Sequence, residues 1–174
     1  MEGSKKMEKI LLGYGFVSIG VTAIGLTRGG SQFVVTRTNR QIMADGDKGP
    51  VKDRIVLDEE VPTLTLRSLT MLPADTAKMY PALAVDSDTV PGTVSITGTG
   101  AIASADYQDK VTWTGVTLDG DDVVITVDNA INLGNIDWSM VDKDEVVPEV
   151  VFTGTYLEAD RTTPPYKIEY TTPV

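Results

Sequence analysis

The chain has 174 residues, of which 41% are hydrophobic, and a formal net charge of −10 without a single cysteine or histidine. This length is sufficient for one domain with a buried core. The lack of thiols and imidazoles excludes disulfides, thiolate clusters, histidine zinc sites and catalysis by cysteine or histidine.

Valine and threonine together make up about a quarter of the chain. Both are β-branched and stiff at χ1, which favours pleated sheet over helix. The sequence therefore predicts a mostly β protein, folded as a β-sandwich or small barrel with one flanking helix.

The N-terminal segment MEGSKKMEKILLGYGF loosely resembles a signal peptide, because a basic patch precedes a short apolar run. Glu2 and Glu8 interrupt that patch, and no small-residue cleavage site follows cleanly. No apolar run reaches the roughly 18 residues that span a bilayer. We expect a soluble intracellular chain with no membrane contact, forming a single domain over residues 1–174 with an N-terminal arm over residues 1–12.

Strand signals begin with the glycine-studded segment Tyr14–Thr27 and a turn at Arg28–Ser31. The segment Ser31–Met43 starts as a buried strand but ends as TRTNRQ, which is polar on both faces. A strand that is polar on both faces is expected to extend beyond the hydrophobic core of its own domain. After a charged tip, the segment Val51–Leu57 is expected to run back alongside this strand.

The tip, MADGDKGPVKDR (Met43–Arg54), holds two glycines, one proline and six charged residues in twelve positions. An ordinary hairpin needs only about two to five connecting residues. This sequence predicts a long projecting hairpin loop over residues 43–54.

The segment Val61–Leu72 alternates between apolar and polar residues, as expected for a strand. A helix of about two turns fits between Pro73 and Pro81, since proline suits a first turn and cannot continue a helix. A short strand is expected at Thr93–Thr97, followed by a glycine- and alanine-rich connector.

The apolar phase changes within Val111–Leu118, where a β-bulge at Gly115 would restore the register. Asp119–Asp122 (DGDD) then predicts a hairpin turn into the strand Val123–Asn129. In Asn132–Met140 we expect a single helical turn with Asn135 as its N-cap.

Two final strands, Val147–Tyr156 and Tyr166–Thr171, bring the expected total to eight or nine.

The glycine-rich segments lack the spacing of nucleotide-binding motifs. GDKGP has no GK[ST] at the distance that a phosphate loop requires. LGYGFVSIG lacks a surrounding strand–turn–helix unit, so a dinucleotide site is not favoured either.

The acidic clusters are expected to be solvated turns and strand ends. DGDD and DKDE (Asp142–Glu145) lack the ligand spacing of a calcium hand, although either could hold a structural calcium ion. Glu59 and Glu60, next to Asp58, could form a carboxylate pair for acid–base chemistry, but nothing in the sequence argues for a pocket there, and a solvated strand end is the favoured interpretation. We expect no enzyme, no cofactor, and no catalytic, cofactor-binding or metal-binding residues.

The net charge lies entirely in Gly92–Val174, since Met1–Pro91 is neutral. An acidic half of this kind repels nucleic acid and keeps the protein soluble.

Several ordered segments resemble the major tail (tail tube) proteins of long-tailed bacteriophages. RGGSQFVVTRTNRQIMADGDKGPVKDR followed by VPTLTLRSLTML resembles the first half of that family. INLGNIDWSMVDKDEVVPEVVFTGTY followed by PPYKIEY resembles the closing half. The resemblance covers roughly Gly13–Tyr170, and Ala84–Ala105 matches least.

The resemblance implies a structural virion protein, in which six copies close into a ring and rings stack into the tail tube. The implied partners are further copies of the chain, the tape measure protein, the tail terminator, and distal tail or baseplate proteins. DNA would pass through the tube without sequence-specific binding. The implied location is the virion tail, assembled in the cytoplasm of the host bacterium.

In such tubes, the long hairpin loop contacts the adjoining ring. The residues implied for this contact are Asp45, Gly46, Asp47, Lys48, Gly49, Pro50, Lys52 and Arg54. Three other interpretations remain open at this point. They are the inner tube of a contractile tail, tailocin or type VI-like system, an immunoglobulin-like binding module, and a loop that is merely a flexible surface feature.

Overall fold

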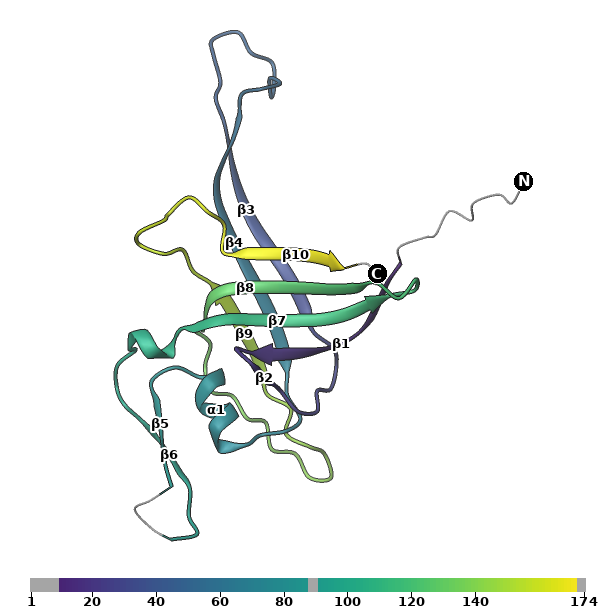
Figure 1. Cartoon of the computed structure of the whole chain (residues 1–174). Helices are drawn as coiled ribbons and strands as arrows, with labels where there is room; N and C mark the ends of the chain where they lie inside the picture. The colour runs from purple at the N-terminus through teal and green to yellow at the C-terminus, as the bar shows by residue number, and fades with distance from the viewer. Residues whose placement is uncertain (1–9, 88–90, 172–174) are drawn as a thin grey trace, which may run out of the picture.

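The computed structural model describes residues 10–87 and 91–171, and confirms a mostly β fold with one α-helix (Figure 1). Eight strands form one antiparallel sheet, and a two-stranded hairpin lies apart from it. The elements in chain order are β1 (Leu11–Ile19), β2 (Thr22–Ala23), β3 (Gln32–Gln41), β4 (Ile55–Arg67), α1 (Pro73–Met79), β5 (Leu83–Asp86), β6 (Ser95–Gly98), the 3₁₀ turn η1 (Ser104–Asp106), β7 (Gln108–Thr117), β8 (Asp122–Asn132), β9 (Glu149–Gly154) and β10 (Tyr166–Thr171).

Strand β8 is the point at which the sheet divides. The strand order is β2-β1-β7-β8-β9-β4-β3, with β10 pairing β8 outside this path. The residues Asp122–Val127 of β8 pair with β10, whereas Ala130–Asn132 pair with β9. The sheet therefore folds into two layers, and the long β3–β4 pair crosses β7, β8 and β10 (Figure 1).

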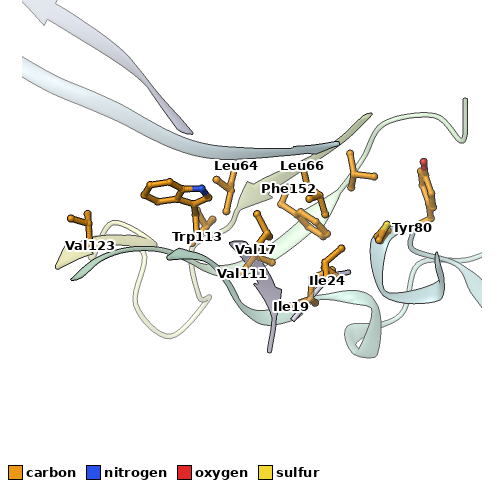
Figure 2. Close-up of a cluster of buried hydrophobic side chains, with 14 residues drawn as sticks. Val17, Ile19, Ile24, Leu64, Leu66, Tyr80, Val111, Trp113, Val123 and Phe152 are labelled. Atoms are coloured by element: carbon orange, nitrogen blue, oxygen red, sulfur yellow. The ribbon is translucent and has the colours of Figure 1, made fainter. Parts of the chain in front are cut away.

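The hydrophobic core fills the space between these layers. Figure 2 shows Val17, Ile19 and Val111 from one layer facing Leu64 and Leu66 of β4. All five are almost completely inaccessible to solvent. Burying an aliphatic side chain of this size contributes about 1.5–3 kcal/mol, so this cluster holds the two layers together.

The expected β-bulge at Gly115 is wrong. Gly115 pairs regularly with Val123 of β8 and with Gly15 of β1, and the irregularity lies in β1, between Leu11 and Gly15. The reason for the glycine is packing, because a Cβ at position 115 would lie 2.1 Å from the Trp113 ring. A Cβ at Gly15 would also meet that ring, at 2.7 Å.

The expected helical turn over Asn132–Met140 is also wrong, since this segment has no helix and Asn135 caps nothing. Asn132 has the capping role instead. Its side-chain amide donates to the Met79 carbonyl oxygen at 3.0 Å, and its Oδ1 accepts the Gly134 N–H at 2.8 Å. These bonds tie the segment to the end of α1.

The remaining expectations have mixed outcomes. The helix between the two prolines is confirmed as α1, with Pro73 in its first turn. One continuous strand, β4, joins the segments expected as Val51–Leu57 and Val61–Leu72, but it begins only at Ile55 and ends at Arg67. With two short extra strands, β2 and β5, the described residues contain ten strands.

The ends and the variable region fall partly outside the described residues. Of the expected N-terminal arm, residues 1–9 lie outside them, while Leu11 and Leu12 already belong to β1. Ala84–Ala105 carries the β5–β6 hairpin and most of η1, apart from residues 88–90, which are not described. Within the described ranges, no helix is long and apolar enough to cross a membrane.

Replacing Gly115 with alanine should destabilise the protein by about 1–3 kcal/mol, because the new methyl group overlaps the Trp113 ring. The measurement is the free energy of unfolding in urea. Gly13→Ala is the matched control on β1, since a Cβ there meets no atom within 4 Å. Equal stability of the two variants would contradict this account of the core.

Candidate assembly interface on the β3–β4 arm

The most distinctive feature of the molecule is a two-stranded ribbon that projects from the sandwich (Figure 1). We call residues 36–60 the β3–β4 arm and residues 42–54 its tip. Strand β9 pairs with β4 only from Thr63 to Arg67, so no third strand of the described residues continues along the arm. An isolated pair of strands is marginally stable in water, which means that other contacts must hold the arm in place.

A buried carboxylate anchors the base of the arm. Glu60 is 8% exposed, and its Oε1 lies 2.6 Å from Nε of Arg37 on the opposite strand. The Tyr166 hydroxyl lies 3.3 Å from the same oxygen, and the Arg37 guanidinium also donates to that hydroxyl at 3.1 Å. The base of the arm is thereby fixed to β10.

A second tyrosine completes the anchor. The Tyr156 hydroxyl donates to the backbone carbonyl oxygen of Glu60 at 3.0 Å. Burial raises the pKa of Tyr156, and the nearby charge of Glu60 raises it further. The pKa of Arg37 is raised by its hydrogen bond to Tyr166 and then by Glu60. Both shifts favour the protonated forms, which are the forms that donate these hydrogen bonds.

The middle of the arm carries a second ion pair across the ribbon. The Arg40 guanidinium donates to both carboxylate oxygens of Asp58, at 3.0 and 3.2 Å. This contact raises the pKa of Arg40. The arginines of TRTNRQ therefore face the acidic residues of the returning strand, which explains why both segments are polar.

The tip is held by internal hydrogen bonds. Oδ2 of Asp47 accepts the Ala44 N–H at 2.7 Å and the Arg54 guanidinium at 2.8 Å. Gly46 has a positive φ of 92°, and Asp53 has one of 67°. Gly49 does not take this conformation, so the second turn of the tip depends on Asp53.

The residues implied for the contact with an adjoining ring fall into two groups, those that are paired within the tip and those that are not. Asp47 and Arg54 pair with each other, and are thus committed within the tip. Asp45, Lys48 and Lys52 are exposed and have no ion-pair partner among the described residues. Gly46, Gly49 and Pro50 belong to the backbone that presents them.

Exposed apolar side chains accompany these charges. Ile42 and Met43 are half-exposed at the start of the tip, and Ile55 and Leu57 are similarly exposed on the returning strand. Charged and apolar side chains presented together at the end of a supported ribbon are suited to contact with another protein.

The acidic clusters are turns or ion pairs in the structure. Asp58, Glu59 and Glu60 do line a surface pocket of about 450 Å³, which nothing in the sequence indicated. Asp58 and Glu60 are each bound by an arginine there, so their carboxylates act as ion-pair partners. Arg28 bridges Asp144 and Glu145, at 3.2 and 2.6 Å. Across residues 10–87 and 91–171, no group of three acidic side chains is placed to hold a metal ion.

The anchor at Glu60 differs from the sequence expectation, which is a solvated strand end at this position. A signal was present, since Arg37 and Arg40 lie on one side of the tip while Asp58 and Glu60 lie on the other. The tyrosines could not have been found, because they lie about a hundred residues further along the chain.

Replacing Glu60 with glutamine should lower the free energy of unfolding by about 1–2 kcal/mol. Hydrogen bonds to charged groups contribute about 1.5–3 kcal/mol, and the half-exposed Arg37 limits the effect. The measurement is urea unfolding. The control is Glu59→Gln at the exposed neighbouring position, which should change stability by less than about 0.5 kcal/mol. Equal effects at both positions would show that the anchor adds nothing.

Comparison with known proteins does not assign the chain to a family. No protein-family model matches it, and no curated protein is similar to it in sequence.

Proposed function

We propose that this protein is the tube subunit of a long-tailed bacteriophage tail, in which six copies close into a ring and rings stack into a tube. The observation that carries the proposal is the anchored β3–β4 arm. The ribbon projects well beyond the sandwich (Figure 1). Its tip carries charges that have no ion-pair partner among the described residues, together with exposed apolar side chains. This is the feature that the resemblance to tail tube proteins predicts.

The edges of the sheet support a repeating assembly. Strand β10 pairs only with β8, and β3 pairs only with β4, so each leaves one edge without a partner strand among the described residues. Open edges are an aggregation hazard unless another chain covers them. A ring in which each copy meets its neighbours along these edges removes that hazard.

Exposed apolar residues on β10 point to the same conclusion. Ile168 and Tyr170 are 47% and 54% exposed. They pair with Ile125 and Val123 of β8, so they lie on the core-facing side of the sheet. The apolar core-facing surface therefore extends to this edge, where it is exposed to solvent, and a neighbouring copy would bury it.

The charge of the chain is compatible with DNA passage. A net charge of −10 repels phosphate, which would allow DNA to slide through a tube of such subunits without binding. Contacts with the tape measure protein, the tail terminator and the distal tail or baseplate proteins would follow from the same role in the virion. The inner tube of a contractile system would use the same interfaces, and a neighbouring sheath gene would distinguish it.

One observation favours a binding module instead. Tyr14 and Phe16 are 65% and 52% exposed, two residues apart on β1, and so they share one face of the sheet. Exposed aromatic rings of this kind can stack on sugars. Such a module would be a stable monomer, and a lasting monomer at high concentration would favour this second candidate.

Replacing Asp45–Pro50 with an Asn-Gly turn should leave the domain folded but prevent tube growth. The tip lies outside the core, and each ring would present six tips that act together. Circular dichroism measures folding, and electron microscopy of concentrated or seeded protein measures tube length.

The control for this variant is Asp109→Ser with Lys110→Ser, which removes two exposed charges outside the arm and should leave growth unchanged. High salt should slow growth of the native protein, because it screens the charge pairs. Tubes of normal length from the shortened variant would contradict the role of the arm. Monomers under every condition would contradict the proposed function itself.

A further inference from the structure

The connection between β8 and β9 lies at the end of the molecule opposite the β3–β4 arm (Figure 1). We call residues 133–148 the β8–β9 loop. Its start is tied to α1 through Asn132, and its last residue, Pro148, accepts the Ser68 N–H at 3.3 Å. Arg28 holds Asp144 and Glu145 beside the sheet. The loop is therefore a supported surface with both ends fixed.

This loop exposes an unusual run of large apolar side chains. Between one-third and three-quarters of each of five side chains is accessible to solvent: Leu133, Ile136, Trp138, Met140 and Val141. Single exposed hydrophobic residues are ordinary, but five within nine positions form a patch that is typical of a protein contact.

The same loop is acidic. It carries four carboxylates and one lysine, Lys143. Asp144 and Glu145 are bound by Arg28, whereas Asp137 and Asp142 have no ion-pair partner among the described residues. A groove of about 410 Å³ opens next to Asp137, and its lining includes Asn132, Ser139 and Glu149. The surface can therefore receive a positively charged side chain.

The tip of the arm has the complementary chemistry. Lys48 and Lys52 are exposed cations of the tip that have no ion-pair partner in the described part of the chain, and Ile42 and Met43 expose apolar surface beside them. A lysine has both an apolar stem and a charged head, which suits a groove bordered by apolar and acidic groups.

We propose that the β8–β9 loop receives the arm tip of a second copy of this chain. Lys48 and Lys52 would face Asp137 and Asp142, and Ile42 and Met43 would pack on the exposed apolar run. Because the two surfaces lie at opposite ends of one molecule, the contact is heterologous. Each copy can receive one arm and offer another, so the contact extends without closing between two copies. The inference rests on the proposed function in so far as it assigns this contact to the stacking of rings.

Cross-linking tests the contact without altering the charges. The chain contains no cysteine, so Ala44→Cys on the tip and Ser139→Cys on the loop introduce the only thiols. Both positions are exposed. A short bismaleimide should link the double variant into a ladder of trimers and larger species on a denaturing gel. Each single variant should give no species larger than a dimer.

The matched control combines Ala44→Cys with Ser104→Cys, an exposed serine on η1. It should give no ladder, and a ladder as strong as that of the test pair would overturn the inference. In the test pair, Lys48→Glu with Lys52→Glu should reduce the ladder severalfold. Adding Asp137→Lys and Asp142→Lys should restore it, since the charges are then exchanged. Failure of this rescue would overturn the assigned charge pairing.

Electron microscopy of the same samples separates this inference from the proposed function. Tubes without a ladder would overturn the contact and retain the tube function. A ladder without tubes would support the contact and overturn the tube function. Neither a ladder nor tubes would overturn both.

Discussion

The arm depends on one buried carboxylate. A ribbon of two strands has no core of its own, and so its direction must be set where it leaves the domain. At that point, Glu60 binds Arg37 from the neighbouring strand and accepts a hydrogen bond from Tyr166 of β10. Removing a charge from water is costly, and it is tolerated here because the carboxylate has an arginine and a hydroxyl as partners. The anchor thus combines strands that are distant in sequence.

Much of the fold follows from local sequence chemistry. β-Branched composition indicates the class, Pro73 marks the first turn of α1, and the polar stretch TRTNRQ indicates a strand that leaves the core. Local rules were sufficient for these elements because their causes are local. The projecting hairpin was predicted for the same reason, since its length and charge are visible in the sequence.

The features that were missed depend on tertiary contacts. Gly115 was interpreted as a bulge, yet its purpose is to leave room for the Trp113 ring. Asn135 resembled a helix cap, whereas Asn132 caps the distant helix α1 through the Met79 carbonyl. Alternation and spacing describe which face a residue occupies. They do not state which side chain lies above it, and so the two tyrosines that complete the anchor at Glu60 could not be derived.

Strand β10 connects the edge of the sheet with the base of the β3–β4 arm. Its outer edge has no partner strand within residues 10–87 and 91–171. Its first residue, Tyr166, reaches the base of the arm and packs against Phe33 at 6.0 Å between ring centroids. A partner that pairs with β10 therefore constrains the strand that holds Tyr166 in place. The edge strand and the base of the arm share one residue, Tyr166, so a contact along β10 and the position of the arm depend on the same strand.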